Sequence, residues 1–308
     1  MKDINTNKVF KTLRLSVACT LMALSSVVAA QQVHFENADQ AANAFVVAVA
    51  RDDEAALSGL LGADYRDVLS LDEIGAALVP KFLDAWISYH TLVPESDKTR
   101  MLAVGETGWT LPLPIVREAD GWRFDLVAGE KVMRIRRIGR NELSAIEAVL
   151  AYHDAQIDYA GQDRDGDGVL EYAQHFISSP GQHDGLYWPA ESDQDQSPLG
   201  PLLAEQDPVK AYHGYYYRIL KAQGEHAPGG AADYVENGNM TQGFAIIAWP
   251  AEYGESGVMS FMLNREGVVY EADLGPDGAA FATSLAAFDP DSHWAPTRDS
   301  MDETDVLK

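Results

Sequence analysis

The chain has one cysteine, Cys19, and its position leaves the rest of the sequence without disulfides or thiol chemistry. Cys19 lies in an apolar segment, residues 15–30, that follows four basic residues and ends in Val-Ala-Ala. This arrangement is typical of a secretory signal peptide, and we expect cleavage after Ala30. The mature chain would contain no cysteine, so packing, with any bound ion, must stabilise its folded state.

Long apolar runs are also scarce, and the segment at residues 15–30 is the one that comes near the length of a membrane span. It contains Thr and Ser and is shorter than the roughly 20 apolar residues that a spanning helix needs. We therefore expect no stable membrane span after signal cleavage, and a periplasmic or secreted location.

Basic residues are few: Lys and Arg number 23 against 47 Asp and Glu, a formal net charge of −24. The signal segment holds four of the basic residues and one acidic residue, so the mature chain would carry 19 against 46, a net charge of −27. Such a surface repels nucleic acid and anionic lipid and attracts cations. We expect the one dense basic cluster to pair with the protein's own carboxylates where two domains meet, with anion binding as the alternative: Lys131, Arg134, Arg136, Arg137 and Arg140.

The strongest chemical motif is an acidic loop with carboxylates at its first, third and fifth positions: Asp163, Asp165 and Asp167. This spacing, with Gly168 at the sixth position, reproduces most of a calcium-binding loop. Glycine is required there because the chain turns in a conformation that a Cβ atom resists. Val169 would offer its main-chain carbonyl, and Glu171, at the ninth position, a carboxylate.

The loop departs from the calcium template at its twelfth position, where Gln174 stands in place of glutamate. One charge and one oxygen are lost, so we expect weak calcium binding, with a Kd of roughly 10⁻⁴ to 10⁻³ M. Four acids within nine residues repel one another unless a cation lies between them. The alternative is a solvated turn without an ion, because Asp and Gly are also favoured turn residues.

The pattern of elements predicts an α+β fold: a signal peptide (1–30), an N-terminal module (31–139), a C-terminal module with the acidic loop (140–290) and an acidic tail (291–308). In the first module we expect helices over residues 36–50, 53–61 and 71–90 and antiparallel strands over 99–104, 110–116 and 122–126. Helices on a curled antiparallel sheet resemble the cone-shaped nuclear-transport-factor-2-like domains. Those domains often enclose a pocket, but the sequence shows no convergent set of polar residues here, so we favour a filled core over a pocket.

The second module is predicted to begin with a long helix over residues 141–159, whose apolar side carries Leu143, Ile146, Val149, Leu150, His153 and Ile157. The helix leads into the acidic loop, and we expect a short second helix over residues 170–177. A second antiparallel sheet is predicted from strands over residues 215–221, 243–249, 258–263 and 268–271, followed by a helix over 276–288.

Two other groups of side chains are functional candidates. His213 would suit a hydrolytic site, but no histidine pair has the spacing of a helical zinc site, and we favour a hydrogen-bonded structural histidine. Aromatic side chains of the second module would suit a carbohydrate ring or a peptide side chain, although we favour a role in the core: Trp188, Tyr212, Tyr215, Tyr216, Tyr217 and Trp249.

Several short motifs also carry a family resemblance, among them residues 136–142, 163–173, 184–189, 214–218, 250–254 and 269–271. In these segments the chain resembles the exported bacterial proteins of the domain-of-unknown-function 2950 family, over nearly all of the mature sequence. The resemblance implies export and says nothing of an activity.

Two functions follow from these observations. The preferred one is a non-enzymatic binding or assembly factor of the bacterial envelope, with a weak structural calcium site, no catalytic residues and an envelope protein or glycan as partner. The alternative is a periplasmic hydrolase that acts on envelope glycan or peptide through carboxylates and His213. If His213 lies far from any carboxylate and outside a cleft, the alternative loses its basis.

Overall fold

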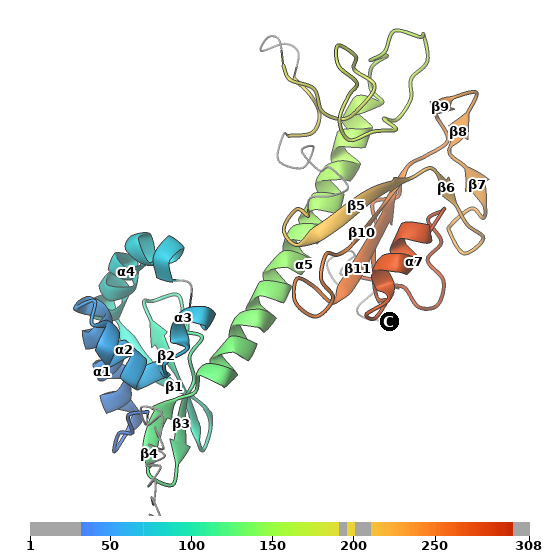
Figure 1. Cartoon of the computed structure of the whole chain (residues 1–308). Helices are drawn as coiled ribbons and strands as arrows, with labels where there is room; N and C mark the ends of the chain where they lie inside the picture. The colour runs from blue at the N-terminus through green and yellow to red at the C-terminus, as the bar shows by residue number, and fades with distance from the viewer. Residues whose placement is uncertain (1–31, 70, 191–195, 201–210, 298–308) are drawn as a thin grey trace, which may run out of the picture. The chain divides into compact units, whose positions relative to one another are not determined.

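A computed structural model describes residues 32–69, 71–190, 196–200 and 211–297 of the 308-residue chain (Figure 1). Contacts divide these residues into two compact units: residues 32–109 with 115–124, and residues 110–114 with 125–297. Both units combine helices with antiparallel strands, which confirms the α+β class. The predicted signal peptide and residues 298–308 of the predicted tail lie outside the described residues.

The first unit, as far as it is described, combines four helices with an antiparallel sheet of order β1-β2-β3-β4. The helices are α1 (Ala38–Ala50), α2 (Glu54–Leu61), α3 (Tyr65–Val68) and α4 (Leu71–Ser88). The strands are β1 (His90–Ser96), β2 (Thr99–Val104), β3 (Ile115–Glu118) and β4 (Gly121–Phe124). The core lies between α1 and the sheet, where the rings of Phe45 and Phe124 have centroids 5.3 Å apart.

Local sequence signals account for much of this unit. The side chain of Asn37 accepts a hydrogen bond from the main-chain N–H of Gln40 at 2.9 Å and so caps α1, and β2 coincides with its predicted range. Strand β1 is absent from the prediction because its residues are mostly exposed and show no apolar alternation. The structure also contains a pocket of about 440 Å³ beside α4 and β2, which opens to solvent because two of its lining side chains, Leu78 and Trp109, are exposed. The cone shape stays a prediction.

The second unit is built on an antiparallel sheet of order β13-β12-β11-β10-β5. Its strands are β5 (Tyr215–Leu220), β10 (Ala245–Pro250), β11 (Met259–Asn264), β12 (Val269–Asp273) and β13 (Ala295–Pro296). Two short strand pairs accompany it: β6 (Ala222–Gln223) with β7 (Ala232–Asp233), and β8 (Val235–Glu236) with β9 (Asn239–Met240).

Two helices, α5 (Leu126–Tyr159) and α7 (Gly278–Ser284), pack against this sheet, with α5 behind it and α7 in front in Figure 1. Every residue of β10 is buried, as expected of a central strand covered on both faces. Within the described part of the chain, no helix is both long enough and apolar enough to cross a membrane.

Helix α5 differs from its prediction in length and in its buried side. It begins at Leu126, after the capping residue Asp125, and runs through the module boundary predicted between residues 139 and 140. Three side chains predicted on the apolar side are exposed: Leu143, Leu150 and Ile157. Val149 is buried as predicted, and Ile146 packs against the core. The rest of the buried side is made by Ala145, Ala148, Tyr152, Ala155, Gln156 and Tyr159. The alanines leave room for the helix to lie close to β10 and β11, and the tyrosines fill the remaining space.

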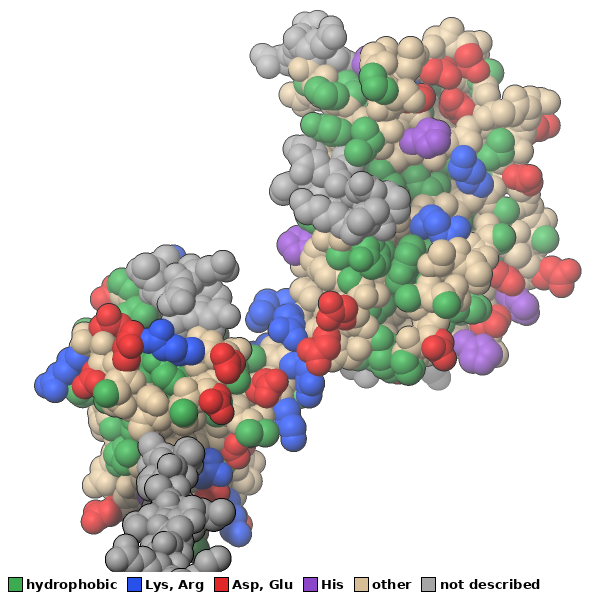
Figure 2. Space-filling model, in the orientation of Figure 1, with side chains coloured by type: hydrophobic (Ala, Val, Ile, Leu, Met, Phe, Trp, Pro, Cys, Tyr) green, Lys and Arg blue, Asp and Glu red, His purple; other side chains and the backbone are tan. Residues whose placement is uncertain are grey.

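The basic cluster lies on the first half of α5, where Lys and Arg side chains gather beside acidic ones (Figure 2). Arg134 and Arg137 donate to the two carboxylate oxygens of Glu255 at 2.9 and 2.8 Å. Arg136 donates to the carbonyl of Thr110 at 2.6 Å. The predicted pairing with the protein's own carboxylates is confirmed for Arg134 and Arg137. Its predicted place, where two domains meet, is not, because both arginines and Glu255 belong to the second unit.

Candidate metal site in the acidic loop

The acidic loop follows the end of α5 and brings three carboxylates together. Oxygen atoms of Asp163, Asp165 and Asp167 lie within 4.8 Å of one another, and all three side chains are exposed. Oxygens bound to one calcium ion at 2.3–2.6 Å are separated by no more than about 5 Å. A single ion therefore fits among these carboxylates.

Main-chain N–H groups of the loop orient the carboxylates. Asp163 accepts hydrogen bonds from the N–H groups of Gly166 at 2.8 Å and Gly168 at 3.0 Å. Asp167 accepts one from the N–H of Val169 at 2.8 Å. The φ angle of Gly168 is +90°, in the left-handed region that favours glycine, so the sharp turn predicted there is present.

The protein supplies little positive charge to the three aspartates: within the described residues, none of them forms an ion pair with Lys or Arg. Arg164 belongs to the loop, but its guanidinium reaches the carboxylate of Asp158 at 3.4 Å and lies 5.5 Å from the ring centroid of Trp188. Main-chain dipoles, solvent or a cation must therefore reduce the mutual repulsion of the aspartates.

Glu171 lies at the edge of this cluster. Its Oε2 accepts a hydrogen bond from the N–H of Met240 at 3.2 Å. Burial raises the pKa of Glu171, and the negative charges of Asp165 and Asp167 raise it further. A cation in the loop would oppose this shift, because it favours the ionised carboxylate.

Gln174, predicted as the closing ligand, has both ends of its amide engaged with neighbouring segments. Its Nε2 donates to the carbonyl of Gly238 at 2.6 Å, and its Oε1 accepts from the Nζ of Lys221 at 2.9 Å. These contacts hold the amide to Gly238, next to β9, and to Lys221, between β5 and β6, so calcium ligation by Gln174 would require them to break.

The helix predicted over residues 170–177 is wrong, since this segment is irregular, with bends and isolated bridges at Tyr172 and Ile177. The N–H of Tyr172 donates to the carbonyl of Met240 at 2.8 Å, and both main-chain groups of Ala173 bond to the side chain of Gln156 at 2.8 Å. Because these groups pair with other segments, they are not available for a helical hydrogen-bond ladder.

Two contacts of the loop have no local signal in the sequence. Asn239 in β9 donates to Oδ2 of Asp167 at 2.5 Å, across 72 residues of sequence. Gln156 lies on the buried side of α5, a position where the helical pattern favours an apolar residue. Both become visible only when the fold brings β9 and the end of α5 to the loop.

His213 does not occupy a catalytic arrangement. It is exposed, has a φ of +48° and lies with Gly214 in a two-residue turn closed by reciprocal main-chain hydrogen bonds between Tyr212 and Tyr215, at 2.8 and 3.0 Å. Its ring packs against Tyr212, and within the described residues it has neither a carboxylate partner nor a hydrogen bond. The structural hydrogen bond predicted for it is not found in the part of the chain that the structure describes, and the hydrolase hypothesis loses the histidine on which it rested.

The aromatic candidates mostly belong to the core of the second unit. Four of them are buried: Trp188, Tyr215, Tyr217 and Trp249. Tyr212 and Tyr216 are partly buried and pack against that core. The interpretation as core residues is confirmed for the first four.

Comparison with known proteins gives one match. No curated protein and no solved structure matches the chain. The model of a family described as "Protein of unknown function (DUF2950)" matches residues 32–297, which include both units and the acidic loop. The chain therefore belongs to the DUF2950 family.

Proposed function

We propose that this chain is a non-enzymatic binding or assembly factor of the bacterial envelope whose second unit holds a weakly bound structural calcium ion. The convergence of Asp163, Asp165 and Asp167 within 4.8 Å, without an ion-pair partner in the described residues, carries the calcium part of the proposal. The signal pattern of residues 1–30 carries the export part.

Calcium in this loop would act on the fold through the loop's contacts with β9. Asp167 accepts from Asn239, and Glu171 accepts from the N–H of Met240, so two of the acidic residues already join the loop to that strand. An ion that neutralises the acids would strengthen this connection between the end of α5 and β9. The expected gain is small: ligand at ten times its Kd adds about 1.4 kcal/mol to the free energy of unfolding.

Thermal unfolding of the purified protein tests the calcium site. Melting temperatures would be compared in excess chelator, in millimolar calcium and in millimolar magnesium, and we expect a rise of a few degrees with calcium that exceeds the rise with magnesium. In the Asp165→Ala variant this rise should be lost, because a central ligand is missing.

Asp233→Ala is the matched control, since Asp165 and Asp233 are both exposed and each accepts a hydrogen bond from the main-chain N–H two residues further on. It should respond to calcium like the unmodified protein. An unchanged calcium response in Asp165→Ala would refute the site. Detection of the tagged full-length chain only in the cytoplasmic fraction, or turnover on a broad panel of envelope hydrolase substrates, would refute the remainder of the proposal.

A further inference from the structure

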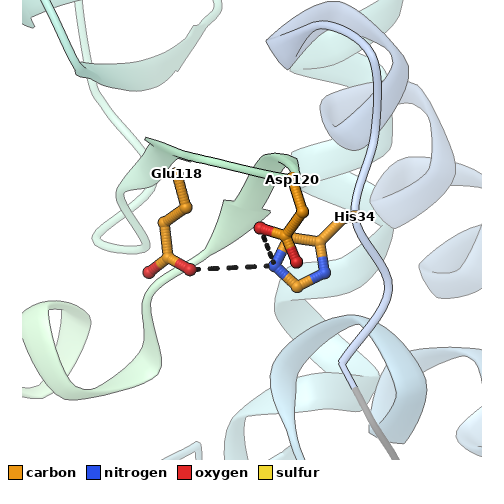
Figure 3. Close-up of side chains that lie close together, drawn as sticks. All are labelled: His34, Glu118 and Asp120. Atoms are coloured by element: carbon orange, nitrogen blue, oxygen red, sulfur yellow. Dashed lines mark ion pairs between the residues drawn. The ribbon is translucent and has the colours of Figure 1, made fainter.

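Three potential metal ligands meet in the first unit, outside the acidic loop: His34, Glu118 and Asp120. His34 lies in the segment before α1, Glu118 ends β3, and Asp120 lies in the turn between β3 and β4. Figure 3 shows one ring nitrogen of His34 facing both carboxylates. No sequence motif links these residues, because the histidine is far from the acids along the chain.

Main-chain pairing holds the segment of His34 against the β3–β4 turn. The N–H of Phe35 donates to the carbonyl of Trp122 at 2.8 Å, and the N–H of Trp122 donates to the carbonyl of Phe35 at 2.7 Å. Gly121 permits this approach, since a Cβ atom at that position would lie 2.5 Å from the carbonyl oxygen of Phe35. The histidine and the carboxylates are thus placed by backbone contacts rather than by flexible side chains.

The imidazole ring of His34 is oriented in the way typical of metal-ligating histidines. Its Nδ1 lies 3.0 Å from the carbonyl oxygen of Gln32, which accepts a hydrogen bond from Nδ1–H. Nε2 then carries the lone pair in the neutral ring and faces the carboxylates. Nε2 is shielded from solvent and makes no hydrogen bond within the described part of the chain.

The distances fit a metal ion better than a direct hydrogen bond. Nε2 of His34 lies 3.4 Å from Oδ1 of Asp120 and 3.8 Å from Oε2 of Glu118. A charge-assisted N–H···O hydrogen bond is about 2.7–2.9 Å long. Two ligands of a tetrahedral zinc ion, each bound at about 2.0–2.1 Å, are separated by roughly 3.3 Å. Small side-chain movements would bring all three atoms to this separation.

Charge and access also favour a cation here. Glu118 uses its other oxygen, Oε1, to accept from Arg123 at 2.5 Å, which leaves Oε2 directed toward the histidine. The side chains of Glu118 and Asp120 are 43% and 57% exposed, so an ion can reach them from solvent. Two carboxylates with one arginine leave a net negative charge beside the imidazole.

We propose that His34, Glu118 and Asp120 form a site for a divalent transition-metal ion such as zinc, with water in the fourth position. One imidazole and two carboxylates are a ligand set that zinc accepts, whereas calcium takes oxygen ligands. The bound ion would fasten the segment before α1 to the β3–β4 turn.

Isothermal titration of the metal-stripped protein with zinc tests the proposal, with millimolar calcium present throughout to occupy the acidic loop. We expect one zinc equivalent whose affinity falls more than about tenfold in His34→Gln and in Asp120→Asn. His226→Gln is the matched control, because His226 faces the single carboxylate of Asp289 at 3.1 Å; it should leave this equivalent unchanged.

Asp120 lies in an exposed turn, so Asp120→Asn should fold normally, and its loss of zinc affinity would not come from misfolding. Circular dichroism would verify that both variants are folded. X-ray absorption of the zinc-loaded protein should show one imidazole among nitrogen and oxygen ligands. Zinc binding that persists in both variants would place the ion elsewhere and overturn the proposal. An absence of zinc binding would also overturn the proposal. The histidine would then form only ionic contacts with Glu118 and Asp120.

Discussion

Replacement of Gln156 by methionine should destabilise the second unit strongly, although the two side chains are similar in size. Gln156 is fully buried on α5. Its Nε2 donates to the carbonyl of Ala173, its Oε1 accepts from the N–H of Ala173, both at 2.8 Å, and Nε2 also donates to the hydroxyl of Tyr152 at 2.9 Å. The amide therefore pairs with both main-chain groups of Ala173, as a neighbouring strand would.

The magnitude follows from the groups that methionine leaves unpaired. The volume changes little, so the cavity contribution is small. The N–H and the carbonyl of Ala173 would both lose their partner, at about 1–3 kcal/mol each, and a total near 4 kcal/mol is expected. The hydroxyl of Tyr152 keeps the bond that it donates to the carbonyl of Ala245. For a unit of this size, such a loss lowers the melting temperature by about 8–16 °C.

Chemical denaturation and calorimetry of Gln156→Met would measure the change, with Glu147→Met as control because Glu147 is exposed on the same helix. The control should stay within about 0.5 kcal/mol of the unmodified protein. Ala173 is the eleventh residue of the acidic loop, so the calcium response should weaken in Gln156→Met as well. A loss below about 1 kcal/mol would refute the reasoning, since it would show that Ala173 finds other partners or water.

Two further predictions concern Glu171 and Gly257. Because the pKa of Glu171 is raised in the folded protein, ionisation of this carboxyl destabilises the fold. In chelator, this loss of stability should be absent below the ordinary pKa of 4.5 and should develop as the pH rises through the raised pKa. The difference in melting temperature between the unmodified protein and Glu171→Gln across that range measures it, and a pH-independent difference would contradict the shift. Gly257→Ala should cost about 1–3 kcal/mol, because its Cβ would collide with the buried ring of Tyr215, whose hydroxyl donates to the carbonyl of Met259. Gly139→Ala, where a Cβ meets nothing within 4 Å, should be neutral or stabilising by up to about 1 kcal/mol, as denaturant titration of both variants would show.

The sequence predicts those parts of the fold whose signals are local. Strand β2 coincides with its predicted range, and four strands of the second sheet are found within two residues of theirs, because their apolar runs are bounded by glycine and polar turns. Strand β13 is not predicted, since its two residues lie in the predicted acidic tail. The buried side of α5 is predicted only in part: Val149 is buried as expected, but leucine and isoleucine outweigh alanine in an apolar pattern while alanine permits the closest approach to a sheet. Leu143 and Ile157 are exposed for this reason, and Ala145 and Ala148 are buried.

The two candidate metal sites differ in predictability for a physical reason. The acidic loop takes Asp163, Asp165 and Asp167 from five consecutive residues, and a glycine turn is enough to make them converge, so spacing alone indicates the site. His34 meets its carboxylates only because Phe35 pairs with Trp122, a contact that depends on the folded sheet and leaves no periodic trace in the sequence. Calcium-type loops are therefore easier to detect from a single sequence than histidine–carboxylate sites that tertiary pairing assembles. It follows that the absence of closely spaced histidines excludes a helical zinc motif and does not exclude a zinc site.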